Sequence, residues 1–208
     1  FHDTVEEAVM IDIDEELVKM AEEHMPEWHA GAFTDPRTTM RYEDARGWLV
    51  ANEGKNWDVV LSDLPNPHED GPGQMLFTKE YFEIAHRALA EDGVFAMQAG
   101  SASENYPDCM LSCIKTLKEV FPYVYGYYGI VNTFFQPWGF VIASKTYDPM
   151  ALTREEIDAR HAARGVKPKY YTGRMHPAVF TLPEYLERGL EGPGARLLTD
   201  AHPFVWTA

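Results

Sequence analysis

Apolar and polar positions follow two alternating patterns along the chain, and these patterns predict strands that alternate with helices. Short apolar runs of the kind found in buried parallel strands occur at 8–13, 39–42, 57–63 and 94–98. Apolar residues recur at helical spacing over 15–24, 45–52, 78–90 and 103–120. Thr78 is the expected N-cap of the third of these helices. This alternation predicts an α/β fold with a parallel sheet and right-handed crossovers.

The C-terminal part of the chain departs from this pattern. The runs at 123–130 and 139–144 are close enough in sequence to form an antiparallel strand pair. A charged helix is then predicted over 153–164, followed by a tail punctuated by prolines. We therefore interpret 1–147 as one α/β domain and 148–208 as a helical and irregular extension that packs on its sheet.

The net charge of the chain limits which kinds of molecule it is expected to bind. The chain has 18 Lys and Arg against 33 Asp and Glu, so its formal net charge is −15. Nucleic-acid binding needs a basic face, which this sequence does not show. An acidic surface suits cationic small molecules, although it also serves plain solubility.

Cysteine use and hydropathy indicate a reduced protein outside the membrane. Cys109 and Cys113 lie four residues apart on one predicted helix and lack the companions of a zinc site. We expect them to be small core residues, and we expect no metal. The sequence contains no apolar run of 18 residues and no signal peptide at its start, which predicts a cytoplasmic location without a membrane span in this segment.

Acidic residues end three successive strand candidates: Asp12, Asp44 and Asp63. Ligands of open α/β sheets bind beyond the carboxyl ends of the strands. There, the first acid can accept hydrogen bonds from both ribose hydroxyls of a nucleoside, and the second can accept one from an adenine amine. The third would lie over the reacting end of the ligand. The alternative is that such acids only cap helices, and for Asp14 capping is the favoured role.

The loop 63–73 follows the last of these strands and contains three prolines and two glycines. Prolines stiffen a chain, so the loop can form a fixed wall of an active site. A rigid surface turn is the alternative, but it leaves the acid at the strand end unexplained.

Several of these segments, taken in order, resemble one known family. They are Val9-Met10-Ile11-Asp12-Ile13-Asp14, 32–37, Asp44-Ala45-Arg46, 63–67, Gly71-Pro72-Gly73, 76–82, 97–101 and Trp138-Gly139-Phe140. The set is similar to the polyamine aminopropyltransferases, the spermidine synthase family. The resemblance runs from about residue 5 to residue 145 and returns in the tail at 169–183.

The resemblance implies a Rossmann-like fold of the class I methyltransferase type, mostly parallel, with an antiparallel pair at its C-terminal end. It implies transfer of an aminopropyl group from decarboxylated S-adenosylmethionine to a di- or polyamine, with methylthioadenosine as product and no cofactor. It also implies a homodimer or homotetramer.

The resemblance assigns roles residue by residue. On the donor side, Asp12 matches the acid that binds the ribose, Asp44 and Ala45 match an Asp-Gly pair at the adenine, and Pro72 matches a proline of the nucleoside pocket.

On the acceptor side, Asp63 matches the catalytic acid that binds the attacking amine and accepts its proton. Gln98 matches a strand-end glutamine that reaches toward the amine. Asn66 stands where the family usually has a second aspartate, so recognition of the amine is expected to differ.

Other departures concern the chain start and two loops. The family's N-terminal β-domain and glycine-rich loop would precede Phe1, so we expect a missing, disordered or separate upstream segment. A chain that starts at Phe1 would expose hydrophobic sheet edges. The loop at 67–71 is about two residues longer than usual, and its acids either replace the lost charge or form a solvated tip. A tyrosine expected near 133–135 is absent, so the amine pocket is expected to lack a hydroxyl.

Two alternatives to the aminopropyltransferase remain open at this level: a non-catalytic scaffold of the same fold, and an S-adenosylmethionine-dependent methyltransferase. The sequence does not specify the amine acceptor.

Overall fold

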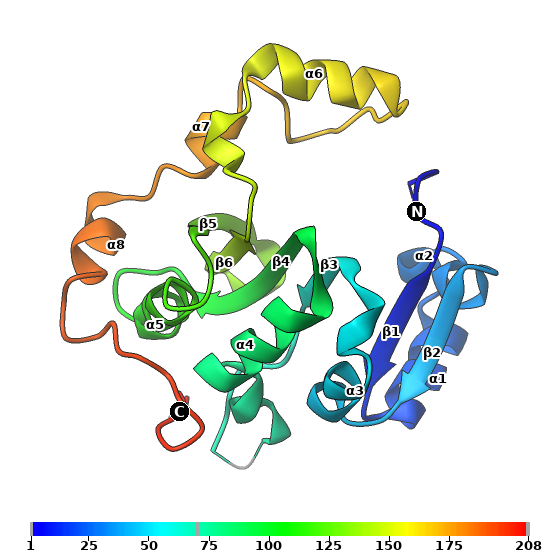
Figure 1. The fold of residues 1–208 in the computed structure, drawn as a ribbon, viewed down its shortest axis with the longest axis horizontal. Coiled ribbons are helices and arrows are strands. Elements are labelled where there is room, and N and C mark those ends of the chain that lie inside the picture. Colours follow the sequence, from blue (N-terminus) through cyan, green and yellow to red (C-terminus); the bar gives the residue numbers. More distant parts are fainter. Residues whose placement is uncertain (1, 70, 207–208) are drawn as a thin grey trace.

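The computed structural model describes residues 2–69 and 71–206, and for Pro72 the backbone alone. The strands lie in two sheets (Figure 1). They are β1 (Ala8–Asp12), β2 (Thr38–Tyr42), β3 (Trp57–Ser62), β4 (Leu89–Ser101), β5 (Tyr123–Val131) and β6 (Gln136–Ser144). The α-helices are α1 (Glu15–His24), α2 (Pro26–His29), α3 (Ala45–Ala51), α4 (Lys79–Ala88), α5 (Asp108–Leu117), α6 (Arg154–Ala163), α7 (His176–Val179) and α8 (Glu184–Gly189).

Polar side chains set the starts of the helices that follow strands. Asp14 caps α1 by accepting a hydrogen bond from the Leu17 amide at 2.9 Å. Thr78 caps α4 in the same way, through the Tyr81 amide at 3.4 Å. Both caps were predicted from the sequence, and the structure confirms them.

Strand pairing confirms the predicted fold class. β1 pairs with β2 in parallel, and the second sheet has the order β3-β4-β6-β5. Within it, β3 and β4 are parallel, while β6 runs antiparallel to β4 and to β5. The predicted antiparallel pair near the C-terminal end is therefore present.

Several element boundaries differ from the prediction. Helix α4 ends at Ala88 and β4 begins at Leu89, whereas the sequence predicted a helix to 90 and a strand from 94. Leu89 already pairs with Trp57 of β3, and the register then shifts, since Val59 pairs with Val94. Helix α5 begins only after Pro107, because proline disfavours a helical residue before it.

The hydrophobic core lies between the four-stranded sheet and the helices α4 and α5. The rings of Phe82 and Phe95 meet there edge to face, with centroids 5.7 Å apart. Cys109 and Cys113 are buried in this core as free thiols, which confirms that they are small core residues. The hydrogen bond with Cys109, together with burial, raises the pKa of the Cys113 thiol.

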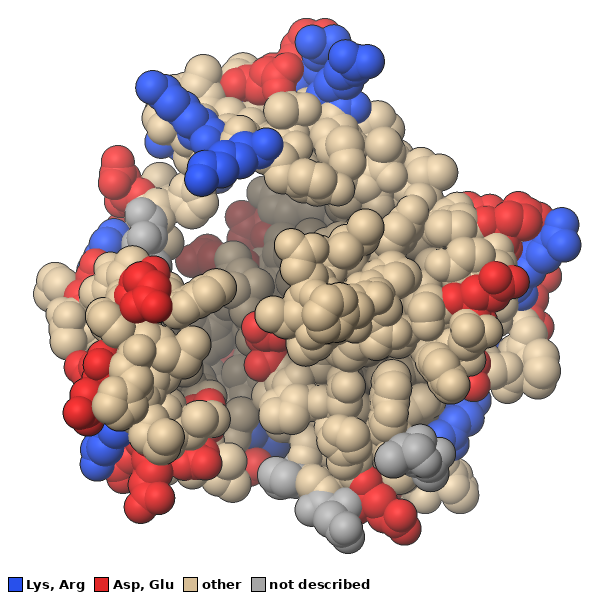
Figure 2. Space-filling model, turned by 180° about the vertical axis from the view of Figure 1, so that it is seen from behind, with Lys and Arg blue, Asp and Glu red and all other residues tan. Residues whose placement is uncertain are grey.

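The two sheets are not joined by backbone hydrogen bonds within the described residues. In Figure 1, β1 lies on the side of its sheet that is nearer to β3, so the free edges of these strands face each other. Figure 2 shows the molecule hollowed between the β1–β2 unit and the rest. Apolar side chains of β3 are open to solvent, with Val59 53% and Leu61 74% exposed. Exposed edges of this kind were expected, while the upstream segment stays a prediction.

Residues beyond 147 fold partly on the α/β domain. Helix α6 stands away from the sheets (Figure 1), whereas α8 packs against α5 through the fully buried Leu186. The predicted domain boundary at 147 stays a prediction. Within the described residues, no helix is long and apolar enough to cross a membrane.

Candidate active site

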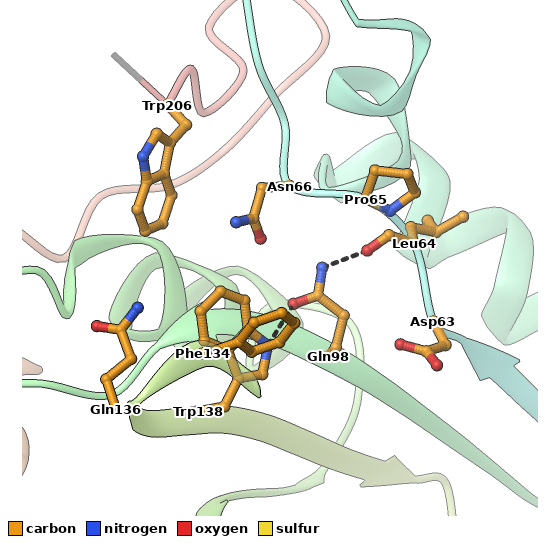
Figure 3. Close-up of a pocket in the computed structure, with 9 residues that line it drawn as sticks. All are labelled: Asp63, Leu64, Pro65, Asn66, Gln98, Phe134, Gln136, Trp138 and Trp206. Carbon is orange, nitrogen blue, oxygen red and sulfur yellow. Dashed lines mark hydrogen bonds between the residues drawn. The ribbon is translucent and has the colours of Figure 1, made fainter. Parts of the chain in front are cut away.

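A pocket of about 340 Å³ opens where β3 and β4 end and β6 begins (Figure 3). Its lining combines one carboxylate, three amides and three aromatic rings with two apolar residues. The lining residues are Asp63, Leu64, Pro65, Asn66, Gln98, Phe134, Gln136, Trp138 and Trp206.

Asp63 is the first residue after β3, and its side chain is exposed at one end of this lining (Figure 3). The preceding Ser62 is buried, and its hydroxyl is 3.3 Å from the hydroxyl of Tyr81 on α4, which anchors the strand end. Burial raises the pKa of Tyr81, so this phenol stays neutral. The Asp63 carboxylate itself makes no hydrogen bond or ion pair with any described residue. It is therefore free to bind a cation.

Gln98 organises the floor of the pocket. It is 5% exposed, and its side-chain amide donates to the Leu64 carbonyl at 2.6 Å. Its side-chain oxygen accepts from the Gly100 amide at 2.9 Å and from Trp138 Nε1 at 3.0 Å. The glutamine thus holds three segments together: the end of β4, the loop that follows β3, and the start of β6. Its oxygen is already shared by two donors, which leaves it little capacity to accept a bond from an amine.

Aromatic rings form much of the remaining wall. Phe134 and Trp138 pack with centroids 4.4 Å apart, and Trp206 lies across from them (Figure 3). Phe134 carries no hydroxyl, and the lack of a hydroxyl in the amine pocket stays a prediction. Faces of aromatic rings attract ammonium groups, and their surfaces pack against methylene chains.

Asp63 is the one charged side chain among these lining residues. Asn66 and Gln136 supply neutral polar groups, and Ser101 Oγ donates to Gln136 Oε1 at 3.2 Å. The geometry suits an elongated cation whose ammonium group lies at Asp63 and whose chain lies among the rings.

The predicted donor-side residues lie outside this lining, at the ends of β1 and β2. Asp12 accepts a hydrogen bond from the Asp14 amide at 2.9 Å. Asp44 Oδ2 caps α3 by accepting from the Gly47 amide at 2.6 Å, and Ala45 is the first residue of that helix. Each carboxylate has a structural role and keeps its second oxygen without a bond to a described residue. Pro72 starts a 3-10 turn, and its side chain lies outside the described part.

Sequence reasoning found Asp63, Asn66 and Gln98 but missed part of the wall. Trp138 belongs to a family motif to which the sequence assigns no role, and Phe134 falls within 133–135, where the resemblance leads us to expect a tyrosine. Trp206 gave no signal, because the irregular tail that carries it has no periodicity from which its position could be inferred.

No cluster of three or more potential metal-binding His, Cys, Asp or Glu side chains occurs among the described residues.

Parallel strands joined by helices, with acids at the carboxyl ends of β1, β2 and β3, define a Rossmann-like domain of the class I methyltransferase type. The sequence profile of the Spermine/spermidine synthase domain family matches residues 1–155. The chain belongs to this family.

Individual relatives agree with the family assignment. The chain is 37% identical over 186 residues to a polyamine aminopropyltransferase of Pyrobaculum arsenaticum, which covers 88% of this chain and 64% of that protein. It is 36% identical over 209 residues to polyamine aminopropyltransferase 2 of Pseudomonas aeruginosa, covering 98% and 58%. The structure superposes on a crystal structure of spermidine synthase in complex with the transition-state analogue AdoDATO, with a TM-score of 0.77 and 27% identity, over 91% of this chain and 63% of that one. The chain thus spans less than two thirds of the length of these relatives.

Proposed function

We propose that the protein transfers an aminopropyl group from decarboxylated S-adenosylmethionine to a di- or polyamine. The observation that carries the proposal is Asp63, whose carboxylate bonds to no described residue and lies at the carboxyl edge of the sheet, at one end of an aromatic pocket. The names of the relatives support the same reaction.

The chemistry suits these residues. The donor is a sulfonium, so the methylene next to sulfur is electrophilic without a metal. The amine nitrogen forms a bond to this carbon, the carbon–sulfur bond breaks, and methylthioadenosine leaves with the electron pair. An amine with a pKa of roughly 10 is protonated at neutral pH and cannot attack until it loses a proton. Asp63 binds this ammonium, orients it toward the donor and assists loss of the proton, with water as its partner.

The other site residues have positioning and binding roles in this proposal. Asp12 and Asp44 use their remaining carboxylate oxygens for the ribose and the adenine, while Ala45 and Pro72 line the nucleoside. Gln98 acts mainly through Leu64 and Trp138, which its hydrogen bonds hold in place. Asn66 contacts the amine with an uncharged amide side chain.

The test is a transfer assay with the protein, decarboxylated S-adenosylmethionine and a panel of diamines and polyamines, with products identified by mass. We expect an amine heavier by one aminopropyl group, together with methylthioadenosine. Methyl transfer from intact S-adenosylmethionine would instead show a methyltransferase. Stabilisation by methylthioadenosine without any transfer would show a non-catalytic relative.

We also propose that the protein works in the cytoplasm as a homodimer or homotetramer. The buried free thiols of Cys109 and Cys113 support a reducing compartment, and the family resemblance supports the assembly. Light scattering on the purified protein measures the assembly, and a monomer would contradict it.

A further inference from the structure

The C-terminal tail from residue 194 to residue 206, here called the strap, follows α8 in the chain and runs along α5 to the pocket. It contains no helix or strand. It is fastened to α5 by the Lys115 ammonium, which donates to the Ala195 carbonyl at 2.8 Å, and by Thr116 Oγ1, which accepts from the Leu198 amide at 3.0 Å. Leu198 itself is fully buried in the core. The strap is therefore a fixed part of the fold.

Asp200 fastens the middle of the strap to two helices beside the site. Its carboxylate forms a bidentate pair with Arg46 of α3, at 2.9 and 2.7 Å, and accepts a hydrogen bond from Thr78 Oγ1 at 2.7 Å. The Asp200 amide donates to the Glu80 side chain at 3.0 Å. Arg46 directly follows Asp44 and Ala45, so the same contact ties the strap to the donor side.

Trp206 ends the strap inside the pocket. Its amide donates to the Pro67 carbonyl at 2.7 Å, so the backbone is bound to the loop after β3. Its ring lies against Gly100, which has a φ of 82°, and a Cβ added there would lie 3.4 Å from the ring. The backbone contact and the close approach at Gly100 hold the ring in one place.

Figure 3 shows Trp206 and Asp63 at opposite ends of the labelled residues, with Asn66, Gln98 and the Phe134 ring between them. An amine bound at Asp63 would thus extend toward Trp206. Since no lining residue at that far end carries a negative charge, an aromatic face is what can recognise a second cationic or methylene segment there.

We propose that Trp206 is a specificity-determining residue, which closes the far end of the acceptor pocket and limits the length of the amine. This inference rests on the proposed aminopropyl transfer. The strap, through Asp200 and Pro67, acts as the support that positions the ring.

The experiment compares wild type, Trp206→Ala, Trp206→Phe and Trp28→Ala with decarboxylated S-adenosylmethionine and linear amines of increasing length. Trp28 lies in α2, is 76% exposed and does not line the pocket, so it controls for loss of an indole. For Trp206→Ala we expect KM for the best wild-type amine to rise about tenfold, with kcat and the donor KM within about twofold. Longer amines should gain relative to shorter ones. Trp206→Phe should recover most of the lost affinity, and Trp28→Ala should match wild type.

The outcomes separate this inference from the proposed function. If wild type transfers an aminopropyl group and Trp206→Ala keeps the wild-type order of amines and their KM values, Trp206 does not set specificity. Equal losses toward all amines and the donor, with a lowered Tm, show a purely structural role and also overturn the inference. Trp206→Phe retains an aromatic ring and keeps the test valid if Trp206→Ala does not fold. If wild type transfers nothing to any amine, the proposed function fails, and this inference fails with it.

Discussion

The carboxylates of Asp12, Asp44 and Asp63 follow or end three strands, and they differ in their hydrogen bonds. Asp12 and Asp44 each accept a hydrogen bond from a nearby backbone amide with one oxygen. This bond orients the carboxylate at the start of a helix. Asp63 has no such bond within the described residues. A carboxylate held by neighbouring amides suits a rigid contact to hydroxyls or an adenine amine, whereas an unpaired one can bind an ammonium and take up its proton.

We expect Asp63→Asn to lower turnover in aminopropyl transfer by at least ~10²-fold, because it keeps the size of the side chain but removes its charge and basicity. Methylthioadenosine affinity should change little, since Asp63 lies apart from the donor-side acids. Asp58→Asn, on the exposed side of the same strand, is the matched control and should leave turnover within twofold. Near-normal transfer by Asp63→Asn, measured by product mass, would remove Asp63 from the mechanism.

The strap makes a prediction about pH. The hydrogen bond and ion pair with Arg46 hold the pKa of Asp200 below its ordinary value. A carboxyl whose pKa is lower in the folded state contributes stability above its unfolded pKa of about 3.9, and loses it as the pH falls through the folded value. At neutral pH, Asp200→Asn should therefore lower the free energy of unfolding by about 1 kcal/mol, a modest amount because both partners are partly exposed.

The difference between wild type and Asp200→Asn should shrink as the pH falls below about 4, because the carboxyl of the unfolded chain becomes protonated there while the folded one, whose pKa is lower, still holds its charge. Urea unfolding at a series of pH values measures it. A difference that is constant from pH 7 to pH 3 would show that the Asp200–Arg46 pair contributes nothing to stability.

At the scale of elements, α5 approaches the sheet closely because glycines lie beneath it. A Cβ added at Gly139 of β6 would lie 2.5 Å from Met110 Sδ and 2.9 Å from its Cγ. Gly126 of β5 faces Ile114 in the same way, at 2.5 Å. This contact brings α5 against the strands whose ends form the pocket wall.

Gly139→Ala should lower the free energy of unfolding by about 1–3 kcal/mol, because the new methyl group overpacks the contact with Met110. Adding Met110→Ala should cost less in the Gly139→Ala protein than in wild type, which a double-mutant cycle measures. Gly129→Ala, which meets nothing within 4 Å, is the control and should be close to neutral. Full additivity of the two substitutions would show that the helix shifts freely.

At the scale of the whole molecule, the two sheets differ in how many strand partners and buried contacts stabilise them. Strands β4 and β6 each have a partner on both sides, and their buried side chains belong to the main core. Within the part of the chain that the structure describes, β1 and β2 pair only with each other, and none of their residues is fully buried. The donor-side acids therefore lie on the less supported sheet and Asp63 on the better supported one.

We expect the hydrogen-bonded amides of β1 and β2 to exchange with solvent at least ~10-fold faster than those of β4 and β6, since local opening of the small sheet breaks few buried contacts. Hydrogen exchange followed by mass spectrometry measures this. Methylthioadenosine should slow exchange in β1 and β2 if Asp12 and Asp44 bind it. Equal protection of both sheets without ligand would show that the molecule unfolds as one unit.

The sequence by itself determined strands β1 to β6 and helices α1, α3, α4, α5 and α6, but not the short helices α2, α7 and α8. It also determined where α1 and α4 begin, the antiparallel pair, the family resemblance and the position of Asp63. These features depend on neighbours in the chain: hydrophobic periodicity, capping side chains, and an acid directly after an apolar run. The tertiary structure decided the rest. The early start of β4 depends on pairing with β3, and the occupied oxygen of Gln98 depends on Trp138, forty residues away. Trp206 enters the pocket because contacts with α3, α4 and α5 fasten an irregular tail. Local sequence carries no record of contacts between such distant residues, so only the folded chain could show them.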